Sequence, residues 1–176
     1  MKRIIAFAGS NSRTSINKQL AVYASSLVGD VAVTVLDLND FDLPLYGIDY
    51  EEEHGIPDNA HKFLEHIRTT DGIILSLAEH NGTYTTVFKN LFDWMSRIDG
   101  KLWSNKPMLL MATSFGARGG ATGLEIAQGR FPYMGGAITG AFVFPSFGEN
   151  FSSGAITNVA LKSQLLDEVE QFKNGL

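Results

Sequence analysis

Short, nearly continuous apolar runs alternate along this chain with longer segments in which apolar residues recur at helical spacing. The runs of strand length are Ile4–Ala8, Val31–Leu36, Gly72–Leu77, Pro107–Thr113 and Ala137–Phe144. Helical periodicity is found at residues 15–28, 57–70, 84–98, 120–130 and 155–174. Continuous apolar strands are typical of parallel sheets that are covered on both faces. The alternation therefore predicts an α/β fold, a doubly wound sheet of five parallel strands with helices on both faces.

No repeat or low-complexity tract divides the chain, and we expect residues 1–176 to form a single domain. One long segment, residues 37–56, has no regular pattern and contains the acidic run Glu51–Glu53. We expect this segment to be irregular. It is either a solvated excursion or a functional wall or partner contact, as long loops often are.

Charge and composition exclude several classes of function. The 176 residues include no cysteine, which removes thiol nucleophiles, disulfides and thiolate metal sites. The 14 Lys and Arg against 19 Asp and Glu give a net charge of −5, so we expect no nucleic-acid partner. The apolar run after Lys2 and Arg3 is too short for a signal peptide or a membrane span. We expect a cytoplasmic protein that does not insert into membranes, and no metal site.

Polar and glycine-rich sequences follow the first, third and fourth predicted strands. Right-handed crossovers place these three loops at one edge of the sheet, where ligands of such sheets bind. The first loop, Gly9–Asn17, combines small polar residues with Arg13 at the start of a helix, a combination suited to phosphate. The alternative is an ordinary helix cap, for which one such residue is enough.

The second and third loops could hold the body of the same ligand. Glu79-His80-Asn81-Gly82 follows the third strand, although a single loop histidine is usually only solvated. Thr113–Ala121 follows the fourth strand and contains Gly116, Gly119 and Gly120, which let a backbone approach a ligand closely or make a flexible turn. Together the three loops predict one phosphate-bearing ligand with an extended body.

These segments resemble a known family, the NAD(P)H-dependent FMN reductases, which include quinone, azo-dye and chromate reductases. Gly9–Asn17 is similar to the family's G-S-x-R-x-x-S-x-N loop, with two residues rather than one between Ser10 and Arg13. Residues 78–94 resemble the segment P-E-Y-N-x-S-x-P-G-x-L-K-N-x-x-D-W, with Ala78, His80 and Thr85-Thr86 as departures. Residues 114–120 match S-x-G-x-x-G-G, and Leu43–Tyr46 resembles the segment after the second strand.

The resemblance implies a flavodoxin-like fold with strand order 2-1-3-4-5 and noncovalently bound FMN. It places the flavin phosphate in the first loop and the ring between the second and third. The implied cofactor-binding residues are Ser10, Arg13, Ser15, Ile16, Asn17, Ala78, Glu79, His80, Asn81, Gly82, Thr113, Ser114, Gly116, Gly119 and Gly120. No side chain is expected to act as a catalytic acid or base, because the cofactor carries the chemistry.

The implied activity is hydride transfer from NADPH or NADH to the flavin, followed by electron transfer to a small acceptor such as a quinone or free flavin. The alternatives are a flavodoxin-like electron carrier and a non-enzymatic flavin-binding regulator. The apolar arc of the helix at 84–98 is wide. It is typical either of a deeply buried helix or of one that also meets a second subunit. With the resemblance, it predicts a homodimer or a dimer of dimers.

Overall fold

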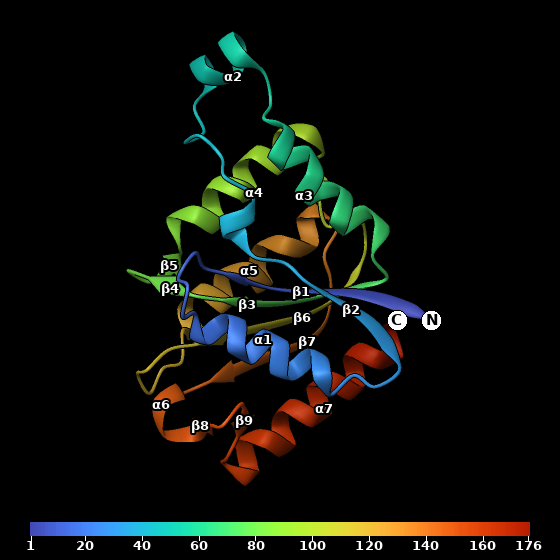
Figure 1. The fold of residues 1–176 in the computed structure, drawn as a ribbon, viewed down its shortest axis with the longest axis vertical. Coiled ribbons are helices and arrows are strands. Elements are labelled where there is room, and N and C mark those ends of the chain that lie inside the picture. The colour runs from blue at the N-terminus through green and yellow to red at the C-terminus, as the bar shows by residue number, and fades with distance from the viewer.

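A five-stranded parallel sheet forms the centre of the computed structural model, which describes all 176 residues (Figure 1). Its strands are β1 (Lys2–Gly9), β2 (Val31–Val35), β3 (Gly72–Leu77), β6 (Pro107–Thr113) and β7 (Ala137–Phe144). Their order, β2-β1-β3-β6-β7, confirms the predicted 2-1-3-4-5 arrangement, and every neighbouring pair is parallel. All five strands lie where the apolar runs predicted them.

Helices cover both faces of this sheet and enclose a separate hydrophobic core on each (Figure 1). α1 (Ile16–Ser26) and α7 (Val159–Gly175) pack on one face, and α3 (Asp58–Thr69), α4 (Thr86–Ile98) and α5 (Ala121–Arg130) pack on the other. Every residue of β3 is buried because it lies in the middle of the sheet with helices on both sides. That double coverage explains the unbroken apolar pattern of the strand.

Two helices begin later than their periodicity predicted, because short hairpins occupy the residues before them. β4 (Glu79–His80) pairs with β5 (Thr83–Tyr84), so α4 starts at Thr86. β8 (Phe151–Ser152) pairs with β9 (Ala155–Ile156), so α7 starts at Val159. Two short helical segments also join the main elements, namely η2 (Phe131–Met134) and α6 (Phe147–Asn150).

Residues 37–56 are more ordered than the sequence predicted. They contain a short 3-10 helix, η1 (Leu38–Asp40), and a helix, α2 (Ile48–His54), that projects from the rest of the molecule in Figure 1. The expectation of a wholly irregular segment is therefore wrong. α2 buries none of its residues, and this absence of an apolar face hides a helix from periodicity analysis.

The wide apolar arc of α4 is covered by its own chain. Phe88, Leu91, Phe92 and Met95 lie in the core above the sheet. Trp94 is fully buried, and its indole Nε1 donates a hydrogen bond of 2.8 Å to the carbonyl oxygen of Pro44. Contacts within one subunit thus cover the apolar arc of α4, and its width does not require a second subunit.

Arg97, on the same helix, pairs with Glu51 of α2 at 2.8 Å. This ion pair and the Trp94 hydrogen bond fasten the projecting segment to α4.

No helix of the structure has the length and apolar character needed to cross a lipid bilayer.

Strand β2 forms one edge of the sheet and pairs only with β1. It is the most exposed strand: Val33 and Val35 are 38% and 42% accessible to solvent. The other four strands, by contrast, each contribute buried residues to the cores, whereas β2 contributes none.

Candidate functional site

The three predicted loops meet at the carboxyl ends of β1, β3 and β6, around a pocket of about 330 Å³. The first loop contributes half of the lining residues, and the second and third loops contribute three residues each. The lining residues are Ser10, Ser12, Thr14, Ser15, Ile16, Asn17, Ala78, Glu79, His80, Thr113, Ser114 and Phe115. Nine of these were among the predicted site residues. The structure thus brings the three segments together as expected.

Several backbone donors of the first loop have no acceptor within the protein. The amides of Arg13 and Thr14 make no hydrogen bond, whereas the Ser15 amide donates to the Ser12 carbonyl at 3.2 Å. The amides of Ile16 and Asn17 lie in the first turn of α1, where no intrahelical acceptor exists. Unpaired amides at a helix N-terminus attract an anion, because they combine hydrogen-bond donors with the positive end of the helix dipole.

The hydroxyls of this loop hold its shape. Ser15 caps α1, since its side-chain oxygen accepts a hydrogen bond of 3.1 Å from the Lys18 amide. The Ser10 hydroxyl oxygen accepts a bond of 3.1 Å from the Ser12 amide. Both hydroxyls keep their own protons available for a ligand.

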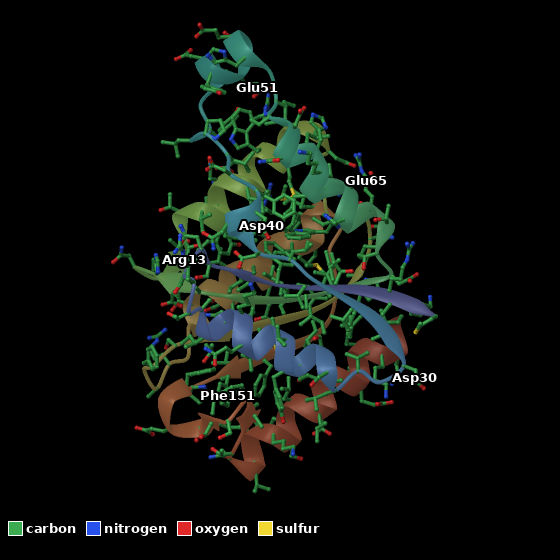
Figure 2. The ribbon with its side chains drawn as sticks, viewed as in Figure 1. Arg13, Asp30, Asp40, Glu51, Glu65 and Phe151 are labelled. Atoms are coloured by element: carbon green, nitrogen blue, oxygen red, sulfur yellow. The ribbon has the colours of Figure 1, made fainter.

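Arg13 is exposed, and its guanidinium makes no ion pair or hydrogen bond with the protein. It lies in the first loop, at the carboxyl edge of the sheet (Figure 2). It does not line the pocket itself. A guanidinium without a partner beside unpaired amides is well suited to a phosphate.

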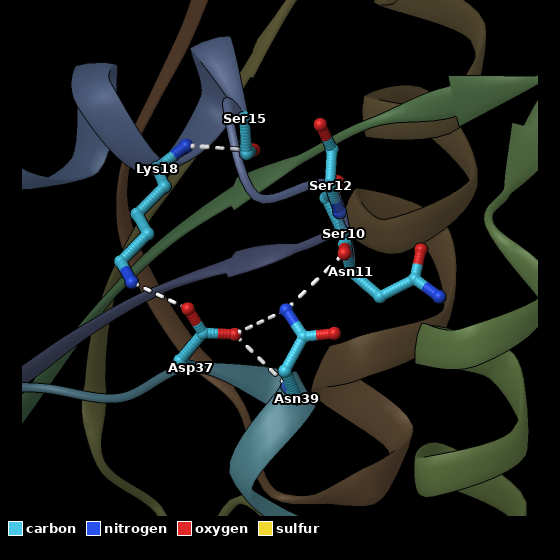
Figure 3. A network of polar contacts seen from close by, with 7 residues as sticks. All are labelled: Ser10, Asn11, Ser12, Ser15, Lys18, Asp37 and Asn39. Atoms are coloured by element: carbon cyan, nitrogen blue, oxygen red, sulfur yellow. Dashed lines mark hydrogen bonds and ion pairs between the residues drawn. The ribbon is translucent and has the colours of Figure 1, made fainter.

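A polar network braces the first loop from the side of β2 (Figure 3). Asp37 accepts a hydrogen bond from the Lys18 ammonium and two from Asn39, whose side chain also donates to the Asn11 carbonyl at 3.1 Å. Partial burial raises the pKa of Asp37, but the bonds from Lys18 and Asn39 outweigh it, so the pKa lies below its usual value. Asp37 therefore stays ionised and fixes the loop to α1 and η1.

Asn17 joins the loops to one another beneath the pocket. Its side chain is 3% exposed. Its Oδ1 accepts hydrogen bonds from the Ser76 hydroxyl at 2.7 Å and the Thr113 amide at 3.1 Å, and its Nδ2 donates to the Thr113 carbonyl at 3.1 Å. One residue of α1 thus binds the ends of both β3 and β6.

The second loop is a β-hairpin rather than an open loop. Asn81 and Gly82 have φ angles of 52° and 77° and form its turn, as the sequence Asn-Gly often does. They and the exposed His80 lie toward the tip, and only His80 of these three reaches the pocket. Glu79 points back and accepts a hydrogen bond of 2.8 Å from the Gly123 amide. The carboxylate thereby ties the hairpin to the first turn of α5.

The third loop owes its glycines largely to packing. Gly119 has φ of +58°, and a Cβ there would lie 2.7 Å from Val143 and 2.9 Å from the Phe144 carbonyl oxygen. Gly120, at φ of +76°, is the N-cap of α5. Both are buried and neither lines the pocket, while Gly116 is exposed. Thr113 is buried as well, and its hydroxyl donates to the Phe144 carbonyl at 2.7 Å.

Three further residues line the pocket that the sequence reasoning did not name: Ser12, Thr14 and Phe115. Ser12 and Thr14 lie inside the predicted loop, so their alternation with Arg13 was an available signal. Phe115 is 72% exposed at the pocket, and an exposed aromatic side chain beside a glycine is a signal that composition hides. Thr85, which departs from the family pattern, caps α4 and donates a hydrogen bond of 2.8 Å to the Gly9 carbonyl.

Comparison with known proteins places this geometry in a family. Residues 2–148 match the family model described as NADPH-dependent FMN reductase. A 2-hydroxy-1,4-benzoquinone reductase from Burkholderia is 35% identical over 134 residues, which cover 75% of this chain and 71% of the relative. A quinone reductase from Escherichia coli K12 is 29% identical over 68% of this chain, and the match spans 63% of that enzyme's length.

Solved structures share the fold over nearly the whole chain. FerB, a flavoenzyme NAD(P)H:(acceptor) oxidoreductase from Paracoccus denitrificans, has a TM-score of 0.83 at 22% identity, covering 99% of this chain and 97% of that one. An NADH:FMN oxidoreductase, EmoB, has a TM-score of 0.74 at 22% identity, with coverage of 100% and 90%. Flavodoxin 1 from Bacillus cereus has a TM-score of 0.61 at 16% identity, with coverage of 100% and 99%.

The family model covers most of the chain, the quinone reductases supply sequence similarity, and the solved structures supply the fold. The predicted resemblance is confirmed. The chain belongs to the NADPH-dependent FMN reductase family, a family of flavodoxin-like oxidoreductases that use FMN and a nicotinamide donor.

Proposed function

We propose that the first loop binds the FMN phosphate through the amides of Arg13, Thr14, Ile16 and Asn17, the hydroxyls of Ser10 and Ser15, and the Arg13 guanidinium. The observation that carries this proposal is the group of unpaired amides at the start of α1, next to an unpaired arginine. A phosphate would supply acceptors for all of them at once. Asn17 takes part through its backbone, since its side chain already holds Ser76 and Thr113.

The flavin ring is proposed to lie between the second and third loops, along Ala78–Gly82 and Thr113–Gly116. The pocket surfaces of Ala78, Glu79, Thr113 and Ser114 support this placement. Gly119 and Gly120, also predicted as cofactor residues, would act indirectly: they let the loop pack against the end of β7 and begin α5.

When bound, FMN supplies the redox chemistry, because it can accept a hydride from a reduced nicotinamide and pass electrons to an oxidised acceptor. The chain's own residues bind and orient the group and shield part of it from water. No side chain in the pocket is placed with a partner as a nucleophile and base would be. We propose a small flat acceptor such as a quinone or free flavin, which the names of the sequence relatives support.

The test is anaerobic spectroscopy of the purified protein after saturation with FMN and removal of unbound flavin. We expect a retained flavin spectrum that bleaches when NADPH or NADH is added and returns when a benzoquinone is added. Retained flavin that neither nucleotide bleaches would instead indicate a flavodoxin-like carrier or a regulator. If no flavin stayed with the protein after the unbound flavin was removed, that result would contradict FMN as a resident cofactor.

We propose, finally, that residues 1–176 act as one domain in the cytoplasm and assemble as a homodimer or a dimer of dimers. The apolar side chains that stay exposed in a single subunit support assembly: Phe115 and Tyr133 are each 72% exposed, and Leu45 is 75% exposed. A dilution series in analytical ultracentrifugation should show a species of twice or four times 19.2 kDa. Monomer at every concentration would contradict the assembly.

A further inference from the structure

A second cavity shares the first loop with the proposed flavin pocket but has no lining residue in common with it. Asn11 lines this second cavity, whereas Ser10 and Ser12, on either side of Asn11 in the sequence, line the flavin pocket. The other lining residues come from η1, from the residues that follow it and from α4, and we call the space the η1 cavity. Its volume is about 360 Å³, within the usual range for small-molecule sites.

Hydrogen bonds to two helices hold the walls of the η1 cavity in place. The Asn90 side chain, on α4, donates to the Pro44 carbonyl at 3.0 Å and accepts from the Tyr46 amide at 2.8 Å. The Asp42 carbonyl accepts a bond of 2.9 Å from the side chain of Asn59 on α3. The chain that follows η1 is thus tied to both helices, and the cavity has its shape before any ligand enters.

One part of the η1 cavity is apolar. Five side chains form it: Leu38, Phe41, Leu43, Val87 and Leu91. Leu38 and Leu91 are buried, and the other three are partly buried against the core. The Phe41 ring is fixed by an edge contact with Phe63, with 4.9 Å between the ring centroids. A fixed aromatic ring among aliphatic side chains is suited to a flat ligand ring.

Three exposed polar side chains at this cavity have unused hydrogen-bonding groups. The Asn11 side-chain amide makes no hydrogen bond within the protein, since only the Asn11 carbonyl accepts one, from Asn39 at 3.1 Å. Asn39 uses its Nδ2 for that bond and for Asp37, which leaves its Oδ1 free. Figure 3 shows the Asn11 amide and the Asn39 Oδ1 on the same side, away from Lys18 and Asp37. The Asp42 carboxylate has neither an ion pair nor a hydrogen bond.

These unused groups fit the edge of one kind of ring. Asn39 Oδ1 lies next to Asn11, because the Nδ2 of the same side chain is 3.1 Å from the Asn11 carbonyl oxygen. An asparagine amide pairs with adenine by giving a proton to a ring nitrogen and accepting one from the 6-amino group. That amino group has a second hydrogen, for which the Asn39 oxygen is an acceptor. The unpaired carboxylate of Asp42 favours an amino group in the cavity and disfavours an anion.

We propose that the η1 cavity binds an adenine base. The Asn11 amide pairs with the 6-amino group and the adjacent ring nitrogen, the Asn39 oxygen accepts the second amino hydrogen, and the ring packs beside Phe41. The base belongs either to a free nucleoside or to the adenine end of a dinucleotide, and its recognition is the same in both. This site takes no part in electron transfer and does not depend on the proposed flavin chemistry.

The test is calorimetric titration of the full chain with adenosine, with FMN present and absent. We expect saturable binding of one adenosine per chain in both samples, because the η1 cavity and the flavin pocket have no lining residue in common. Inosine should bind about tenfold more weakly or worse, because its carbonyl replaces the amino group and would face the Asn39 oxygen. Loss of adenosine binding on addition of FMN would place the nucleoside in the flavin pocket and overturn the proposal.

Two substitutions locate the site. Asn11→Ala should weaken adenosine binding about tenfold, the effect of losing a bidentate pair with the base. Asp42→Asn should weaken it several-fold by removing the negative charge. Neither should lower the melting temperature, since neither side chain makes a hydrogen bond within the protein.

Matched controls are Asn174→Ala, which removes an exposed amide on α7, and Asp30→Asn, which removes an exposed carboxylate before β2. Neither should change adenosine binding. No binding at millimolar adenosine, equal binding of inosine, or full affinity in the Asn11→Ala protein would overturn the proposal.

Competition identifies the source of the base. If NADH displaces adenosine, the adenine end of a dinucleotide enters the cavity, and if it does not, the cavity takes the free nucleoside; both results support an adenine site. Displacement by reduced nicotinamide mononucleotide, which has no adenine, would overturn it. Flavin absorbance in the same samples tests the proposed function separately.

Discussion

At the scale of single residues, some side chains of the first loop hold the structure together, whereas Arg13 is free to bind a ligand. Ser10, Ser15 and Asn17 use their side-chain oxygens to hold the loop and its neighbours in place. The Arg13 side chain makes no hydrogen bond or ion pair within the protein. Substitution of the two kinds of residue should therefore affect stability and ligand affinity differently.

Arg13→Ala should weaken FMN binding and leave the fold intact. A charged hydrogen bond to phosphate contributes about 1.5–3 kcal/mol, and the substitution removes no hydrogen bond or ion pair within the protein. Flavin fluorescence titration would measure the dissociation constant, and urea unfolding of the flavin-free protein would measure the stability. Lys162→Gln is a control for the lost charge. Unchanged affinity would mean that the phosphate binds elsewhere.

Asn17→Ala should destabilise the flavin-free protein as well as weaken flavin binding. The substitution leaves the Ser76 hydroxyl and both backbone groups of Thr113 without partners, and each buried polar group left unpaired costs about 1–3 kcal/mol. Urea unfolding would measure this loss. Asn174→Ala, at an exposed position in α7, should have almost no effect. Equal stability of the two variants would contradict the bracing role of Asn17.

Tyr84 should make the protein sensitive to alkali. Burial raises the pKa of its phenol from 10.0 to about 12, and the charge of Arg130 only partly opposes the shift. The folded chain then keeps a proton that the unfolded chain releases near pH 10, so stability is unaffected below that pH and falls between pH 10 and about 12. Urea unfolding across this range should show a shallower decline for Tyr84→Phe. Identical slopes would exclude Tyr84 as the group responsible.

At the scale of elements, the backbone geometry of the third loop determines which residues the loop can carry. Gly119→Ala should destabilise the fold by about 1–3 kcal/mol, since it adds an unfavourable φ to a Cβ contact of 2.7 Å with Val143. Gly100→Ala, where the added atom meets nothing within 4 Å, is the matched control. Thermal unfolding would compare them. A Gly119→Ala protein as stable as the control would show that the loop relaxes freely.

The sheet and its helices could be predicted because the pattern of apolar and polar residues along the chain reflects which positions are buried. Strands covered on both faces, such as β3, give unbroken apolar runs, and α4 has a strong amphipathic period. α2 could not be predicted, because it buries no residue and depends on contacts of Trp94 and Arg97 with distant positions. The convergence of the three loops followed from topology. The contacts of Glu79 and Asn17 could not be predicted from topology, since each joins two residues more than forty positions apart in the sequence.

At the scale of the whole molecule, the residues that stabilise the fold lie apart from most of those that line the pocket. Two cores lie on opposite faces of one sheet, while the first pocket lies beyond the carboxyl ends of its central strands. Most residues that face the pocket therefore belong to loops, which can vary without disturbing either core. Asn17 is one exception, because it reaches beneath the pocket to β3 and β6.

Strand β2, with its open edge, gives the protein a route to aggregation. Its sequence, Val-Ala-Val-Thr-Val, carries no charge, and an uncharged exposed edge can add a strand from another molecule when helices loosen on warming. Val33→Lys should slow the growth of intermolecular β-sheet in heated samples, followed by infrared spectroscopy. Val22→Lys, at a similarly exposed position on α1, should give little protection. The order of the strands, which assembles the pocket at the centre of the sheet, thus also leaves β2 as the place where storage and heating would first damage the protein.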